Sequence, residues 1–482
     1  MQKPGEPSFK RSLNLFDSTA IVVGSMIGSG IFIVSADMSR TLGAPGWLLV
    51  AWAVTGVMTI LAALSYGELA SMMPKAGGQY VYLREAYNPL TGFLYGWTLF
   101  TVIQTGTIAA VAMAFAKFAG VLFPFFSEDN VWLDVGFVKF NTVQILAIST
   151  IIILTWLNTQ GIKLGKIIQN FFTSTKAIVL VAFLIAGFFF VKSSAADTGN
   201  SLIFWDAMKI DGGKATGLAG FALIAAIGTA MVGSLFSSDA WNNITFTAGE
   251  VINPKRNIPL SLFFGTLIVT VIYILVNMVY LNTLPLRGVE DGATAFEKGI
   301  QFATNDRVAT ASISGLFGEY AAVIMAVFIM ISTFGCNNGL ILSGSRVYYA
   351  MANDGLFFKK VGQLNKKGVP SAGLFVQCIW ASLLCLSGTY GNLLDYVVFA
   401  VLIFYSLTIA GVFILRVKQP NAERPYKAFG YPVLPALYIL AAAFIMIILL
   451  IYKPDYTWPG LVIVLVGIPV YFIMKKKIGE RR

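Results

Sequence analysis

Two clusters of glycine, serine and aspartate interrupt long apolar stretches of this chain. The first is Gly28-Ser29-Gly30 and the second is Ser237-Ser238-Asp239. A helix that is broken inside a bilayer exposes N–H and C=O groups, which only protein, water or a ligand can satisfy there. Two such breaks at matching places in two halves of a chain therefore predict a binding site for a small solute midway through a membrane.

The two breaks differ in the polarity of the backbone that they would expose. If the helix unwinds at 28–30, the half-helix that begins near Ile31 presents free N–H groups and the positive end of its dipole, which suit a carboxylate. Carbonyls at the unwound end before Ser237 suit an ammonium group or a cation. Together the two breaks describe an α-amino acid. For the first cluster, close helix packing through Gly24 and Gly28 is the alternative.

Three side chains at or near the breaks could take part in binding. Phe236 could cover a bound ligand as an aromatic gate, or it could simply pack in the bundle. Asp239 could cap the following half-helix, bind an amine or take up a proton, and capping is preferred because Asp is a strong N-cap. Lys176 could replace a bound cation by donating hydrogen bonds to the first helix; the alternative is that it snorkels to the interface.

A second set of charged residues lies near the expected ends of membrane spans. Glu68, Glu250 and Arg346 could form ion pairs that close the inner mouth of a pathway. For Lys255 and Arg256, solvation in a connector is an equally good explanation of the charge.

These residues need long apolar elements to position them. The chain has 482 residues, of which 57% are hydrophobic and 12% are charged, whereas soluble domains are about 25% charged. Stretches long enough to cross hydrocarbon, about 20 residues each, recur along the chain. We therefore expect an all-α polytopic membrane protein with twelve transmembrane helices. The expected spans are 17–42, 46–72, 85–121, 141–160, 166–191, 217–252, 259–283, 317–352, 371–387, 391–415, 433–452 and 457–474.

The lysines and arginines are unevenly distributed over the connectors. Of the 34, 23 fall on the side of the N-terminus and nine on the other side, while Lys117 and Lys176 fall within spans. The positive-inside rule then places both termini in the cytoplasm. Because this topology explains the net charge of +11, nucleic-acid binding is not expected.

Composition also bears on several other chemistries. Histidine is absent, so any proton coupling must use carboxylates, Lys176 or bound water. Cys336, Cys378 and Cys385 all fall within expected spans, which implies neither a disulfide framework nor a cysteine metal motif. No metal-ligand cluster or activated nucleophile stands out, so we expect no enzyme, no metal and no cofactor. A membrane receptor or channel is a remote alternative, because the chain has no signalling segment and concentrates its polarity at two breaks.

The order of the spans predicts an internal repeat. Five spans counted from each break form two units, and an odd number of spans precedes the second, so the units are oppositely oriented. Two spans follow the second unit. The expected parts are a cytoplasmic arm at 1–16, a first inverted repeat at 17–191, a second inverted repeat at 217–415, two further spans at 416–474 and a basic cytoplasmic tail at 475–482.

Several stretches taken together resemble a known family. They are Gly28-Ser29-Gly30-Ile31-Phe32, Tyr66-Gly67-Glu68-Leu69, Lys75-Ala76-Gly77-Gly78-Gln79-Tyr80, Ala240-Trp241-Asn242 with Glu250 and Asn253-Pro254, and Phe334-Gly335-Cys336-Asn337-Asn338-Gly339 with Ser345-Arg346. With them the chain resembles the amino acid–polyamine–organocation superfamily, and within it most closely the L-type amino acid transporter group and its bacterial homologues. The stretches are spread over the first eight spans.

The resemblance implies a fold and a transport mechanism. The fold is the LeuT-type five-plus-five inverted repeat with helices 1 and 6 discontinuous and two additional C-terminal helices. Such proteins move amino acids across the membrane by alternating access. Lys176 matches a lysine of the fifth helix that stands in the place of a sodium site, which implies sodium-independent transport.

The resemblance also assigns the substrate contacts. Backbone N–H groups around Ser29, Gly30 and Ile31, next to Gly28, would hold the substrate carboxylate. Phe236 would be the gate. The carbonyls that would take the substrate amine belong to Ile27, Phe236, Ser237 and Asp239.

One departure from the family concerns partners. Animal relatives pair through a disulfide with a single-span glycoprotein, using a cysteine in the outer connector after the third span. Residues 122–140 contain no cysteine. We therefore expect no disulfide-linked heavy chain and a stand-alone protein of a bacterial inner membrane, with a small-molecule L-amino acid as substrate. Antiport of neutral amino acids is preferred; a proton-coupled or cationic amino acid permease is the alternative, with Asp239 as the charge partner.

Overall fold

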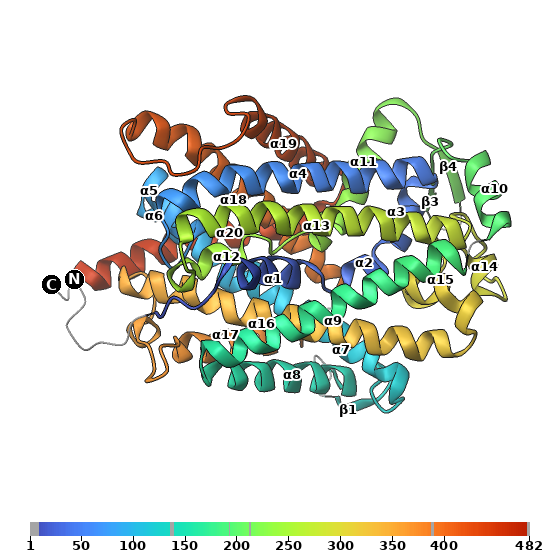
Figure 1. Ribbon diagram of the computed structural model, residues 1–482, viewed down its shortest axis with the longest axis horizontal. Helices are drawn as coiled ribbons and strands as arrows, with labels where there is room; N and C mark the ends of the chain where they lie inside the picture. Colours follow the sequence, from blue (N-terminus) through green and yellow to red (C-terminus); the bar gives the residue numbers. More distant parts are fainter. Residues whose placement is uncertain (1–8, 135–138, 192, 212–213, 387–389, 480–482) are drawn as a thin grey trace.

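The computed structural model describes residues 9–134, 139–191, 193–211, 214–386 and 390–479. Residues 1–8 of the expected arm and 480–482 of the expected tail lie outside this part of the chain. The molecule is an elongated bundle whose long helices run along its longest axis (Figure 1).

The first half of the chain forms ten helices, one π-helical turn and one strand pair within the described residues. They are α1 (Leu15–Met26), α2 (Gly30–Ile33), α3 (Ser35–Leu42), α4 (Pro45–Met72), α5 (Gln79–Ala86), α6 (Pro89–Thr98), the π-helical η1 (Leu99–Ile103), α7 (Gln104–Leu122), β1 (Val131–Asp134), β2 (Lys139–Asn141), α8 (Thr142–Thr159), α9 (Ile162–Phe189) and α10 (Ser194–Leu202). Because α6, η1 and α7 follow one another without a gap, they form one 34-residue span.

The second half begins with another strand pair. Its elements are β3 (Met208–Asp211), β4 (Lys214–Gly217), α11 (Gly220–Ser237), α12 (Asn243–Phe246), η2 (Ala248–Glu250), α13 (Pro254–Thr283), α14 (Ala295–Lys298), η3 (Thr304–Asp306), α15 (Val308–Phe317), α16 (Tyr320–Asn353), η4 (Lys359–Gly362), α17 (Ser371–Leu384), α18 (Tyr390–Lys418), α19 (Val433–Tyr452) and α20 (Pro454–Gly479).

The number of membrane-length helices differs from the expected twelve. Within the described residues, eleven helices are long and apolar enough to cross a membrane. The ninth expected span, 371–387, appears as α17, an apolar helix of 14 residues. At 1.5 Å per residue such a helix is about 21 Å long, shorter than a hydrocarbon core of about 30 Å. The chain is therefore a multi-pass membrane protein, with eleven membrane-length helices in the part that the structure describes.

Two small hairpins correct the expectation of an all-α fold. β1 pairs with β2 and β3 with β4, each antiparallel. Both lie in connectors between spans. Outside the bilayer a short strand pair can leave its outer edges to water, whereas inside hydrocarbon an open edge would carry unsatisfied polar groups.

The two ends of the bundle are named here after the helices that lie at them. The α5 end holds α5, α12 and the C-terminal end of α20, and the α10 end holds α10, α14 and the hairpins (Figure 1). Near the middle of the long axis, α1 gives way to α2 (Figure 1). Helix α1 packs against α9, α13 and α16, so its interruption is enclosed by protein.

Candidate functional site

The first break lies between α1 and α2. Helix α1 ends at Met26, Ile27 has extended backbone angles (φ −77°, ψ 96°), and α2 begins at Gly30. Val34, between α2 and α3, has helical angles, so the half-helix continues as far as Leu42. Glycine and serine carry a helix-propensity cost, which explains why the interruption falls in this sequence.

The carbonyls released at the end of α1 are all engaged by side chains. An interrupted helix leaves its last four C=O groups without intrahelical partners, and here residues 24–28 each accept a hydrogen bond from a neighbouring helix. The donors are Lys176 to Gly24 (2.8 Å) and Ile27 (2.7 Å), Cys336 to Ser25 (3.0 Å), Tyr273 to Met26 (3.1 Å), and Ser332 to Gly28 (3.0 Å). The break is therefore built into the surrounding helices.

Lys176 is the one charged donor in that group. Its ammonium lies 2.8 Å from the Gly24 oxygen, 2.7 Å from the Ile27 oxygen and 3.2 Å from the oxygen of Ser332. The residue is 2% exposed, so its ammonium ends within the bundle and not at an interface. Within the described ranges it has no carboxylate partner. A positive charge thus sits on the carbonyls of a broken helix, an arrangement that elsewhere holds a metal cation.

The second break follows α11, which ends at Ser237. Ala240 has a positive φ of 63°, unusual for a residue with a side chain, and α12 begins at Asn243. The expectation that Asp239 caps the following half-helix is wrong. The N-cap of α12 is Asn242, and the Asp239 carboxylate instead accepts a hydrogen bond of 2.6 Å from the Tyr405 hydroxyl. An extra turn of loop separates Asp239 from the helix that it would have to cap.

The two breaks meet at a small buried cavity. Gly30 and Ser237 are in direct contact, since a Cβ on Gly30 would lie 2.1 Å from the Ser237 hydroxyl oxygen. Most of the residues predicted to bind substrate come together here. The cavity is lined by Ser25, Met26, Gly28, Ser29, Gly30, Thr107, Val111, Phe236, Ser237, Asp239, Ala240 and Cys336.

Two of the predicted residues lie behind this surface. Ile27 and Ile31 are fully buried and do not line the cavity. The Ile27 oxygen already accepts from Lys176 and the Ile31 oxygen from Tyr280 (3.0 Å). The Ser237 oxygen likewise accepts from Tyr273 (3.0 Å). The Ser332 hydroxyl also lies 3.2 Å from the Ile27 oxygen. A carbonyl has two lone pairs, so the oxygens of Ile31 and Ser237 each keep one acceptor site, whereas that of Ile27 is engaged twice.

Comparison with known proteins identifies the kind of protein that carries this cavity. A family model described as amino acid permease matches residues 13–473. The chain belongs to the amino acid permease family.

Individual relatives of the permease are transporters. The b(0,+)-type amino acid transporter 1 of Oryctolagus cuniculus is 30% identical over 427 residues, which cover 88% of this chain and 80% of the relative. The same-named protein of Homo sapiens is 28% identical over 98% of this chain and 89% of its own length. The large neutral amino acids transporter small subunit 2 of Mus musculus is 28% identical over 97% and 82%. The permease is thus a membrane transporter of amino acids and not an enzyme.

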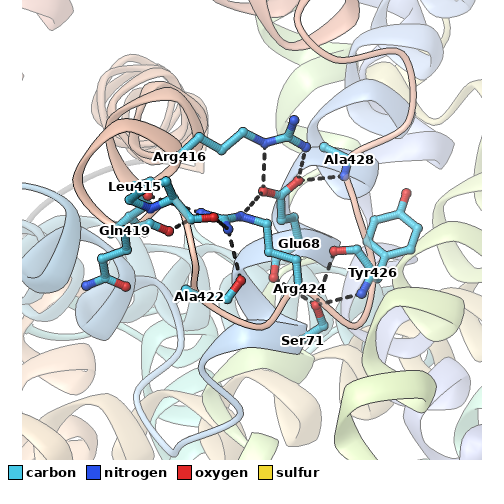
Figure 2. Close-up of polar contacts among 10 residues, drawn as sticks. Glu68, Ser71, Leu415, Arg416, Gln419, Ala422, Arg424, Tyr426 and Ala428 are labelled. Carbon is cyan, nitrogen blue, oxygen red and sulfur yellow. Dashed lines mark hydrogen bonds and ion pairs between the residues drawn. The ribbon is translucent and has the colours of Figure 1, made fainter.

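At the α5 end of the permease, Glu68 of α4 lies within a cluster of arginines. Arg416 donates to both carboxylate oxygens (3.0 and 2.6 Å), and the Arg424 guanidinium lies 3.3 Å away. The backbone N–H of Ala428 adds a hydrogen bond of 2.7 Å. Figure 2 shows the two guanidinium groups converging on the Glu68 carboxylate, which is 1% exposed.

A second ion pair joins Glu250 of η2 to Arg346 of α16. The Arg346 Nη2 and Nε atoms lie 3.0 and 3.1 Å from the Glu250 Oε1, and both side chains are 3% exposed or less. The backbone oxygen of Glu250 also accepts from Ser12 and Leu13 at 2.8 and 3.0 Å. The segment before α1 is thereby fastened to η2, which follows the second break.

The predicted grouping of these charges needs a correction. Glu250 pairs with Arg346, but Glu68 does not belong to that group and pairs with Arg416 and Arg424. The sequence analysis missed these two arginines. Arg416 lies in the last turn of α18 and Arg424 in the connector after it, so no local spacing connects them with Glu68. Only their expected place on the same side of the membrane could have suggested it.

The sequence analysis also missed the hydroxyl groups at the breaks. Ser332 of α16 donates a hydrogen bond at the first break, and Tyr405 of α18 donates one at the second. Tyr273 of α13 reaches both breaks. In an apolar span a single tyrosine or serine has no periodic signature, and its usual role is packing or a bond to its own helix.

Proposed function

We propose that the permease is a sodium-independent antiporter of neutral L-amino acids that works by alternating access. The observation that carries this proposal is the position of the Lys176 ammonium, 2.8 and 2.7 Å from two carbonyls at the break of α1. An ammonium attached to α9 supplies the charge that a dissolved cation would otherwise bring, so the site is complete without sodium.

The cavity supports a zwitterionic substrate with an uncharged side chain. Backbone N–H groups at Ser29, Gly30 and Ile31 would hold the carboxylate, and carbonyls from Phe236 to Asp239 would take the ammonium group. Phe236 borders the cavity at 7% exposure, as a gate over the ligand requires. Among the described residues that line the cavity, Asp239 is the one charged side chain. One relative is named for large neutral amino acids, which agrees with this choice.

Alternating access would use a LeuT-type inverted repeat of residues 17–191 and 217–415, with α17 as ninth helix and two more helices in 416–474. Helices at equivalent places of the two units pack in pairs: α4 on α13, α7 on α16, and α8 on α17. Pairwise contacts of this kind support a twofold relation between the units. Under this proposal the broken spans 1 and 6 are α1 with α2, and α11 with α12.

The two ends of the bundle support a state that is closed at the α5 end. At that end, the Glu250–Arg346 pair and residues 12–13 hold the segment that follows the second break. At the α10 end a hollow of about 730 Å³ is lined in part by Ala114 and Phe118 of α7. The cavity touches the same helix at Thr107 and Val111. We infer that substrate enters through this hollow.

We further propose that both termini are cytoplasmic and that the protein lies in a bacterial inner membrane. The distribution of 23 basic residues against nine supports this orientation. A disulfide-linked heavy chain is not part of the proposal, because residues 122–140 have no cysteine and Cys336, Cys378 and Cys385 are buried.

The experiment that tests antiport uses proteoliposomes loaded with a labelled neutral amino acid such as leucine. Efflux is expected to depend on neutral amino acids outside the vesicle and to saturate with their concentration. Competition by the other proteinogenic amino acids would define the side chains accepted. Efflux that ignores external substrate, or that rises without saturation, contradicts the proposal.

A second candidate function, proton-coupled or cationic amino acid transport, rests on Asp239. Its carboxylate is 8% exposed, borders the cavity and accepts from Tyr405, and no basic side chain of the described residues pairs with it. Asp239→Asn keeps the size of the side chain and removes its charge. The antiport proposal expects uptake of neutral substrates with an unchanged pH dependence. Loss of pH dependence or of cationic substrates in this variant would favour the second candidate.

A further inference from the structure

A large apolar groove opens at the α5 end of the bundle, away from the substrate cavity. It lies between Leu64 of α4, Leu260 and Phe263 of α13, and Tyr426 and Phe429 of the connector between α18 and α19. Its volume is about 810 Å³, within the range of ligand pockets, about 300–1,000 Å³. Phe429 is 68% exposed.

The rim of the groove is basic. Lys255 and Arg256 line it from the first turn of α13, and both are exposed. The Lys255 ammonium lies 2.9 Å from the Glu423 carboxylate, but the two side chains are 50% and 75% exposed. A pair so open to water contributes little to stability, so another anion can replace the Glu423 carboxylate beside Lys255. Within the described residues, the Arg256 guanidinium has no side-chain partner.

The apolar groove and its basic rim together indicate what kind of molecule would bind there. Basic pockets between transmembrane helices bind anionic lipid headgroups, and acyl chains cover the apolar surface beside them. We propose that this groove binds an anionic glycerophospholipid, with its phosphate at Lys255 and Arg256 and an acyl chain along Leu260, Phe263 and Phe429. The proposal goes beyond amino acid transport and does not rest on the antiport mode.

The groove shares its connector with the Glu68 cluster. The N–H of Tyr426 donates to the Ser71 hydroxyl (3.3 Å), and the N–H of Ala428 donates to Glu68 (2.7 Å). Tyr426 also lines the groove, and Ala428 directly precedes Phe429 of the groove wall. A lipid held against Tyr426 and Phe429 therefore presses the connector onto α4 and supports the ion pairs of Glu68.

Native mass spectrometry of the purified full-length permease tests the proposal. The protein is equilibrated in detergent with phosphatidylglycerol or with phosphatidylcholine of the same acyl chains. We expect preferential retention of phosphatidylglycerol by the wild type. The double variant Lys255→Gln, Arg256→Gln should retain about tenfold less, as the loss of two charges near a headgroup implies. Phe429→Ala should also retain less, because it shortens the apolar wall.

Lys427→Gln is the matched control, because Lys427 is an exposed basic residue of the same connector that does not line the groove. It should retain phosphatidylglycerol as the wild type does. The proposal is overturned if the double variant and Phe429→Ala both retain wild-type amounts, or if phosphatidylcholine is retained equally well. Displacement of the lipid by excess inorganic phosphate would also overturn it, since the site would then be one for the free anion.

Discussion

At the scale of single residues, Lys176 explains how a broken helix is held inside a membrane. An ammonium group has three N–H donors, and Lys176 finds three carbonyl acceptors, at 2.7, 2.8 and 3.2 Å. A buried charge is costly unless it is hydrogen-bonded. Here the break supplies the acceptors and the lysine supplies the charge, so each satisfies the other.

Replacing Lys176 by alanine should therefore weaken substrate binding. The change removes charged hydrogen bonds from two residues of the first break, and such bonds contribute about 1.5–3 kcal/mol each. We expect the half-saturating substrate concentration for exchange to rise at least about tenfold, which corresponds to about 1.4 kcal/mol. The measurement is the concentration dependence of exchange in proteoliposomes.

The control for that substitution is Lys163→Ala. Lys163 lies on the same helix as Lys176, α9, but it is exposed and lies away from the breaks. It should leave the half-saturating concentration unchanged. If Lys176→Ala also left the half-saturating substrate concentration unchanged, the Lys176 ammonium would have no role in substrate binding.

At the scale of elements, the two broken helices are joined through α13. The Tyr273 hydroxyl lies 3.1 Å from the Met26 oxygen at the end of α1 and 3.0 Å from the Ser237 oxygen at the end of α11. One side chain thus reaches both breaks. Since a hydroxyl has a single proton, it can donate to one oxygen at a time and can pass between them as the helices move.

Tyr273→Phe tests this link. The variant keeps the ring and its edge contact with Trp52 but loses the hydroxyl. We expect turnover in the exchange assay to fall several-fold, since one of the two carbonyls loses a net hydrogen bond of about 1 kcal/mol. Tyr320→Phe is the control, because Tyr320 is 75% exposed and lies outside the site. Equal turnover in both variants would argue against a role for the Tyr273 hydroxyl.

The elements also show what the sequence could and could not predict. Glycine and serine within an apolar stretch predict a break, and a lysine within a span stands out because its charge is rare there. The partners of these residues carry no comparable signal. Arg416 lies 348 positions from Glu68 and Tyr405 lies 166 positions from Asp239, so only the folded bundle brings them together. The hairpins were missed because their strands have only three or four residues each, too few to show an alternating pattern.

At the scale of the whole molecule, the α5 end is fastened by two buried ion-pair groups. One joins α4, through Glu68, to the last turn of α18 and to the connector after it. The other joins η2 to α16 through Glu250 and Arg346. The α10 end has a hollow lined in part by α7, the helix that also borders the cavity. Opening the α5 end would require at least one of these groups to separate.

Glu68→Gln should consequently destabilise the permease. Removing one partner of a buried ion pair costs about 3–5 kcal/mol, because the other charge is left uncompensated. We expect a clearly lower melting temperature in detergent. Glu85→Gln is the control, since Glu85 forms a half-exposed pair with Arg84 and such pairs contribute about 0–1 kcal/mol. Equal melting temperatures for the two variants would contradict the buried-pair interpretation.

The central claim is that the Lys176 ammonium makes a dissolved cation unnecessary at the first break. The most direct test is the initial rate of neutral amino acid exchange in proteoliposomes, measured in sodium buffer and in choline buffer of equal ionic strength. The account predicts the same rate and the same half-saturating concentration in both buffers. A rate or an apparent affinity that rises several-fold with sodium would contradict it.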